Sequence, residues 1–166
     1  LVGDFLFSRA FQVMVEDVTA SGAAGHGVAA QSIGGDVVVR RTVANNNLSG
    51  DGLYLLAGRD VWLEGNTTEL NGAGGVDVVA GRDVWVTGPG TASSNVGSGL
   101  ALQAGREVRV SGQTSDNNTV SGLSIAFPTG HGVVTIEDAS SQGNGWHGFA
   151  VDANNGGTVV ISDSTA

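Results

Sequence analysis

The fold of this chain is decided by residues 52–63, which read GLYLLAGRDVWL. The same pattern returns as GVDVVAGRDVWV at residues 75–86 and as GLALQAGREVRV at residues 99–110, at spacings of 23 and then 24 residues. A repeat with a period between about 20 and 50 residues is typical of solenoids, in which each unit stacks on the next one. The sequence therefore predicts a repeat fold.

The repeat extends in both directions from this stretch. Each unit contains two short runs in which apolar and variable residues alternate, separated by Gly, Asn, Ser and Asp, and this pattern indicates strands rather than helices. One coil cannot cover its own apolar side, so stacked coils must pair their strands in parallel. We place the coils at residues 12–35, 36–59, 60–82, 83–106, 107–132 and 133–157, with a last strand that begins near Thr158.

The predicted fold class is all-β: a single-stranded, right-handed parallel β-helix (solenoid) of about six coils of 23–26 residues. We expect one domain over residues 1–166, because 28 glycines and 40 % hydrophobic residues without a collagen period favour a folded, turn-rich chain. Residues 1–11, with the apolar Phe5-Leu6-Phe7, are predicted to cap or plug one end. Since Leu1 opens the chain without a start Met or a signal region, we interpret it as an excerpt or a processed form.

Alternation assigns the side chains to the two faces of each strand. The inward positions of both strands carry aliphatic residues that stack into columns, and full burial of each contributes about 1.5–3 kcal/mol. In the first strand these inward pairs are Val13/Val15, Val37/Val39, Val61/Leu63, Val84/Val86, Val108/Val110, Val134/Ile136 and Val159/Ile161. In the second strand they are Val28/Ala30, Leu53/Leu55, Val76/Val78, Leu100/Leu102, Leu123/Ile125 and Phe149/Val151.

Asparagine recurs four residues before the repeat glycine, and Asn47 falls one place out of step with this series. Stacked asparagines would form a hydrogen-bonded ladder along the axis while tolerating left-handed backbone. Ordinary turn composition is the alternative explanation, and both interpretations make these residues structural. The series is Asn71, Asn95, Asn118 and Asn144.

Two charged columns are expected beside the first strand, Arg59, Arg82 and Arg106 next to Asp60, Asp83 and Glu107. We interpret them as an ion-pair network, because columns of like charge would repel unless a column of opposite sign lies beside them. The functional alternative is that Asp60 and Asp83, one coil apart, form the carboxylate pair of a retaining glycosidase. The neighbouring arginines would hold both carboxylates ionised, which is unsuitable for a general acid.

The outward column of the first strand reads Met14, Val38, Trp62, Trp85, Arg109, Thr135 and Val160. It places Trp62 about 5 Å from Trp85, with Arg109 stacked on the next coil. Exposed aromatic side chains are suited to a protein partner or a sugar. Trp62, Trp85 and Arg109, together with Tyr54 on the outward side of the second strand, are therefore the candidate contact residues for a partner or a saccharide. Coverage by a loop or another chain is the alternative.

Several function classes are disfavoured by composition. Sixteen acidic residues face seven arginines and no lysine, a net charge of −9, so nucleic acid and anionic membranes are not expected partners. There is no cysteine, and His26, His131 and His147 are interpreted as turn residues, so no metal site and no cofactor are predicted. A weak calcium site stays open, although Gly74-Gly75-Val76-Asp77 is a lone fragment of the calcium-binding nonapeptide. No catalytic residue is assigned.

The repeat phrase Ala-Gly-Arg-Asp-Val-Trp, with the preceding Gly-Leu-Tyr-Leu-Leu, resembles the β-helical repeats of filamentous-haemagglutinin-like exoproteins, the adhesins of Gram-negative two-partner secretion. The resemblance covers residues 52–110. It implies an extracellular adhesive fibre. The coils are longer than is usual for that family and also look like those of pectate-lyase-type β-helices, which imply a polysaccharide-acting enzyme instead.

We therefore expect a non-enzymatic structural or adhesive module of an exported bacterial surface or fibre-forming protein, located outside the cell or on its surface. Its expected partners are other copies, end to end or side by side, and surface proteins or glycans, without membrane insertion. The alternative is a carbohydrate-active β-helix protein that binds or cleaves a polysaccharide.

Overall fold

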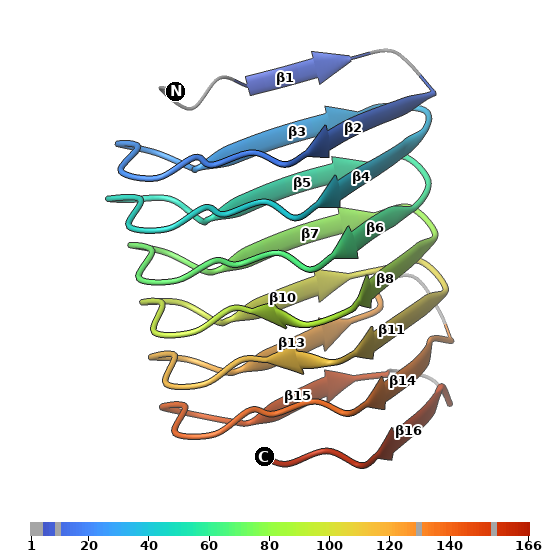
Figure 1. Cartoon of the computed structure of the whole chain (residues 1–166). Helices are drawn as coiled ribbons and strands as arrows, with labels where there is room; N and C mark the ends of the chain where they lie inside the picture. Colours follow the sequence, from blue (N-terminus) through green and yellow to red (C-terminus); the bar gives the residue numbers. More distant parts are fainter. Residues whose placement is uncertain (1–4, 9–10, 129–130, 154–155) are drawn as a thin grey trace.

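The computed structural model describes residues 5–8, 11–128, 131–153 and 156–166, and for residues 5–8 it describes the backbone alone. Over these residues the chain contains strands and no helix, and successive coils stack along one axis (Figure 1). All pairing between strands is parallel, as in Val61↔Val84 and Leu63↔Val86. The predicted all-β solenoid of about six coils is confirmed.

Two seven-stranded sheets form the long sides of the solenoid, with one strand from each coil in each sheet. Sheet A consists of β1 (Phe5–Ser8), β3 (Val28–Ser32), β5 (Leu53–Ala57), β7 (Val76–Ala80), β10 (Leu100–Gln103), β13 (Leu123–Ala126) and β15 (Phe149–Asp152). Sheet B consists of β2 (Gln12–Glu16), β4 (Asp36–Arg40), β6 (Val61–Glu64), β8 (Asp83–Thr87), β11 (Glu107–Ser111), β14 (Val133–Glu137) and β16 (Thr158–Ser162).

A third, shorter ladder completes each coil and was not predicted from the sequence. It contains β9 (Gly90–Thr91) and β12 (Gln113–Thr114), which pair with each other, and single bridges such as Thr19↔Val43 and Val43↔Thr67. Each coil contributes only one or two residues to this ladder, too few for an alternating pattern to be visible.

The N-terminal segment that was predicted to cap or plug the solenoid lies partly outside the described residues, which leave out 1–4, 9 and 10. Its described part, β1, pairs in parallel with β3. Residues 5–8 thus extend sheet A by one more strand of the same kind.

The interior between the sheets is filled by the aliphatic columns that alternation predicts. Val37, Leu53 and Val84 are among the side chains that are completely buried. The pair Val159/Ile161 differs, because β16 is the last strand of sheet B and leaves these side chains 43 % and 48 % exposed. Val38, which the sequence places in the outward column, is 3 % exposed, and its register neighbours are the larger residues Met14 and Trp62.

Two corners of each coil use left-handed backbone. One corner follows each strand of sheet B, and the other precedes the asparagine turn. Their residues with positive φ are Asp17, Arg41, Gly65, Gly88, Gly112, Asp138 and Asp163 at the first corner, and Gly22, Asn46, Leu70, Ser94, Asn117 and Gly143 at the second. Gly, Asn and Asp adopt this conformation at low cost, so Arg41, Leu70 and Ser94 are the unusual members.

Candidate functional site

The asparagine turn is a continuous ladder inside the solenoid. The Nδ2 of Asn71 donates to Oδ1 of Asn95 at 3.0 Å, and the Nδ2 of Asn95 donates to Oδ1 of Asn118 at 3.1 Å. Asn118 donates in the same way to Asn144. Asn47, which the sequence places out of step, also belongs to the ladder, because its Nδ2 donates to Asn71 at 2.8 Å. The spacing to its glycine is longer because that turn contains one extra residue.

The charged columns pair between coils. Arg59 lies 3.5 Å from Asp36, and Arg82 and Arg106 make two contacts each to the aspartate of the preceding coil. Asp60 and Asp83 are 7 % and 2 % exposed, and Asp60 also accepts the backbone N–H of Asp83. These two carboxylates are thus fully engaged in holding adjacent coils together.

Glu107, the third member of the acidic column, departs from this arrangement. Its Oε1 accepts a hydrogen bond from Nε of Arg109 on the same strand, at 2.6 Å. This bond, followed by the negative charges of Glu107 and Glu137, raises the pKa of the Arg109 guanidinium above its usual value. Among the described residues the ring contacts are those of His26 with Tyr54 and of Trp62 with Trp85, so the expected stacking of Arg109 on Trp85 is not present.

Trp62 and Trp85 lie side by side on the outer face of sheet B. Both occupy outward positions in the alternating runs of β6 and β8, and the register pairs them directly. Their ring centroids are 4.0 Å apart with an interplanar angle of 25°, and Trp62 is 43 % exposed. Because the two indoles stack along the axis, each covers one face of the other. The free face of Trp85 is therefore the one on the β11 side.

An open groove of about 500 Å³ lies on that side of Trp85. The sequence identified three of the residues that line it, Trp85, Arg109 and Thr135, as members of one outward column. Apart from the inward Val110, which also lines the groove, the others are the outward residues two places further along β8, β11 and β14, and the sequence did not single them out. Those residues are Thr87, Ser111 and Glu137.

Tyr54, the fourth contact candidate, stacks on another side chain of the same chain. Its ring stacks on His26 at a centroid distance of 4.7 Å and an angle of 18°. Nδ1 of His26 accepts the backbone N–H of Asp51 at 3.0 Å. Asp77 follows Tyr54 in the register of sheet A, and burial, followed by the charge of Asp51, raises the pKa of the Asp77 carboxyl. Tyr54 thus belongs to a polar cluster on sheet A, away from the tryptophans.

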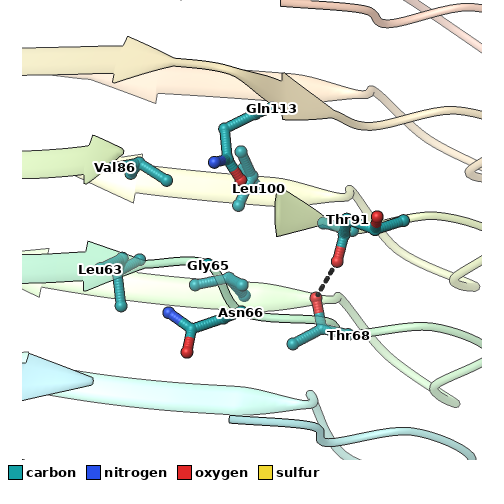
Figure 2. Close-up of a pocket in the computed structure, with 10 residues that line it drawn as sticks. Leu63, Gly65, Asn66, Thr68, Val86, Thr91, Leu100 and Gln113 are labelled. Atoms are coloured by element: carbon teal, nitrogen blue, oxygen red, sulfur yellow. Dashed lines mark hydrogen bonds between the residues drawn. The ribbon is translucent and has the colours of Figure 1, made fainter. Parts of the chain in front are cut away.

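A second hollow lies inside the solenoid, between Leu63, Asn66, Thr68 and Gln113 (Figure 2). Thr68 donates to the backbone carbonyl of Thr91 at 3.4 Å across one side of it. Its volume of about 10 Å³ is the space of a single water molecule. It is a packing gap beside the third ladder and is too small for an organic ligand.

The described residues contain no group of three or more His, Asp or Glu side chains placed to hold a metal ion. They also contain no helix that is long and apolar enough to cross a membrane. On the outer face of sheet B around the tryptophan pair, several chemically different side chains meet beside an open groove.

Comparison with known proteins gives one match. No curated protein and no solved structure matches the chain. A family model described as a right-handed β-helix region matches residues 6–166, almost the whole chain, and supports the predicted handedness. The chain belongs to the right-handed β-helix family.

Proposed function

We propose that this chain is a non-enzymatic, adhesive module of an exported bacterial surface protein, whose rigid solenoid presents the outer face of sheet B to a ligand on another surface. The observation that carries the proposal is the stacked pair Trp62 and Trp85 beside an open groove. Large aromatic side chains at the surface contribute much of the binding energy in protein contacts and are costly to expose without a use.

The architecture supports the same proposal. A solenoid is held by contacts between neighbouring coils, so its outer face is free to differ from coil to coil without loss of the core. The resemblance of residues 52–110 to the repeats of filamentous-haemagglutinin-like exoproteins supports export by two-partner secretion and a location at the cell surface.

The enzymatic alternative is favoured less by the side-chain contacts. A retaining glycosidase needs one carboxylic acid and one free carboxylate about 5 Å apart. Asp60 and Asp83 lie on adjacent coils, but both are buried and bound by arginine. Buried carboxylates whose oxygens already contact arginine have no access to a substrate.

Adhesion of the full chain to cells tests the proposal. Fluorescently labelled protein is incubated with bacterial and epithelial cells, and the bound fraction is measured for the native chain, Trp85→Ala and Trp146→Ala. Trp146 is the matched control, since it is 73 % exposed and lies outside sheet B. We expect native adhesion to fall at least about tenfold in Trp85→Ala and to persist in Trp146→Ala.

Two results would overturn the proposal. One is equal adhesion of the native chain and Trp85→Ala, which would remove the tryptophan face from the contact. The other is release of new reducing ends from a panel of neutral and acidic polysaccharides by the native chain, which would make the module an enzyme.

A further inference from the structure

We propose that the groove on the β11 side of Trp85 binds a neutral saccharide, with one pyranose ring stacked on the free indole face. This inference rests on the proposed adhesive function and names the chemical class of its ligand. It depends on four features of the groove: its aromatic wall, its hydroxyl groups, its charge and its rigidity.

The aromatic wall is one face of Trp85. The other face is covered by Trp62 at a centroid distance of 4.0 Å, so the indole is fixed in orientation by the stack. A pyranose ring carries an apolar face of C–H groups and a rim of hydroxyls. An indole held at the wall of a groove provides a flat apolar surface for the C–H face of the sugar. The residues around the indole must supply hydrogen bonds for the sugar hydroxyls.

The rim supplies these hydrogen bonds from three hydroxyl side chains. Thr87, Ser111 and Thr135 all line the groove. Thr87 donates a long bond of 3.4 Å to the carbonyl of Leu63, and within the described residues the hydroxyls of Ser111 and Thr135 make no hydrogen bond. A hydroxyl both donates and accepts, which matches the hydroxyls of a sugar.

The charge of the groove selects neutral sugars over acidic ones. Arg109 is the cation that lines it, and its Nε is already bonded to Glu107 at 2.6 Å. Glu137 adds a second carboxylate, so the three charges sum to −1. The whole chain carries −9, and a uronate or sulfated sugar would meet repulsion both locally and at long range.

The groove is preformed. Its side chains stand on β8, β11 and β14, which are consecutive strands of sheet B in continuous parallel register. Its volume of about 500 Å³ lies within the range of small-molecule sites. Little side-chain or backbone ordering is required on binding, so a shallow contact with one ring can still give measurable affinity.

Titration of the full chain with defined oligosaccharides tests the inference. The probes are cellohexaose and galactohexaose as neutral sugars and hexagalacturonate as the acidic one, with tryptophan fluorescence and saturation-transfer NMR as readouts. We expect the neutral probes to bind, the acidic probe to bind at least about tenfold more weakly, and Trp85→Ala to lose at least tenfold in affinity. Trp146→Ala should keep native affinity, and Trp85→Phe, which retains an aromatic face, should lie between the two.

A second variant keeps the inference testable if Trp85→Ala fails to fold. Thr135→Val keeps the shape of the side chain and deletes its hydroxyl, so we expect a loss of about three- to tenfold with an unchanged circular dichroism spectrum. Tighter binding of the acidic probe would overturn the inference, and so would equal affinities of Thr135→Val and the native chain. Adhesion that depends on Trp85, in a chain that binds neither neutral probe, would overturn the saccharide assignment and leave the adhesive function in place.

Discussion

The asparagine turn and the outer face of sheet B differ in how far the residue at an equivalent position is the same from coil to coil. At the turn, the same side chain returns in coil after coil, and Asn47, Asn71, Asn95 and Asn118 are each 1 % exposed. On the outer face of sheet B the register positions that pair with one another carry five residue types over seven strands, and only Trp62 and Trp85 repeat in neighbouring coils. In order they are Met14, Val38, Trp62, Trp85, Arg109, Thr135 and Val160.

The difference follows from what each position contacts. An asparagine in the turn bonds to its own equivalent in the next coil, so a change in one coil leaves buried groups without partners in the coils on either side. An outward residue on a strand is constrained mainly by β propensity and by its neighbours. Positions that repeat therefore maintain the fold, and positions that vary are available for binding. The predictions below test this division, beginning with the largest effect.

Asn95→Ala should cause the largest loss of stability. Oδ1 of Asn95 accepts the backbone N–H and the Nδ2 of Asn71, and its Nδ2 donates to the carbonyl of Thr68. Since buried groups left without partners cost about 1–3 kcal/mol each, we expect the free energy of unfolding to fall by about 3–5 kcal/mol. Urea denaturation measures this value.

Asn144→Ala is the matched control. Asn144 closes the ladder and is only partly buried, so the groups it leaves behind are nearer to solvent. We expect about half of the loss found for Asn95→Ala. Equal losses at the two positions would show that the ladder is not cooperative along the axis, and would weaken the contrast between the two regions.

Gly75→Ala should rank second. A Cβ at this glycine would meet the carbonyl oxygen of Gly99 at 2.6 Å and Nδ2 of Asn95 at 2.8 Å, so the methyl group would push the ladder apart. Overpacking of this kind costs about 1–3 kcal/mol. Gly34→Ala is the control, because a Cβ there meets no atom within 4 Å and φ is not left-handed. A fall in the urea midpoint of Gly34→Ala as large as that of Gly75→Ala would contradict the explanation.

The stacking and the core could be predicted from the sequence because they repeat. Inward pairs such as Leu53/Leu55 are identified by two independent patterns, the alternation of apolar residues within a strand and the return of the pair once per coil. The two patterns agree on which residues are buried. The third ladder was missed because one or two residues per coil show no alternation. The place of Asn47 in the asparagine ladder was missed because one inserted residue shifts its spacing to the repeat glycine. Register placed Trp62 beside Trp85, but it did not give the orientation of the indoles.

The polar part of the groove was missed for a related reason. Ser111 and Glu137 do not repeat and belong to no motif, and their position next to Trp85 depends on the register of three strands. The Arg109 side chain was expected over the tryptophan, and its hydrogen bond to Glu107 two residues away was not considered. Arg109 thus pairs with Glu107 on its own strand instead of stacking on Trp85 in the neighbouring coil.

Leu70→Asn should stabilise the protein. Leu70 has a φ of 57° at a corner where the other coils carry Asn46, Ser94 and Asn117, and it is 58 % exposed. Left-handed backbone costs an ordinary residue about 1–2 kcal/mol, and asparagine lowers that cost. We expect a gain of about 0.5–1 kcal/mol in urea denaturation. The reciprocal change, Asn117→Leu, should lose a similar amount, and a gain in both variants would refute the conformational explanation.

Asp77→Asn should have the smallest effect and should depend on pH. Burial and the charge of Asp51 raise the pKa of Asp77, while His26 opposes this shift, so the folded chain binds the proton more tightly than the unfolded chain does. The stability of the native protein therefore falls as pH rises from about 4 through the folded pKa, and it stays lower above that value. Asparagine carries no charge, so the variant should have a melting temperature about 1–2 °C above native at pH 7. The gap should close below about pH 4, where Asp77 is protonated in both states. If the melting temperatures of the variant and the native chain differed by the same amount at pH 7 and below about pH 4, side-chain shape would explain the difference. The charge of Asp77, a carboxylate on sheet A that does not repeat, would then not be its cause.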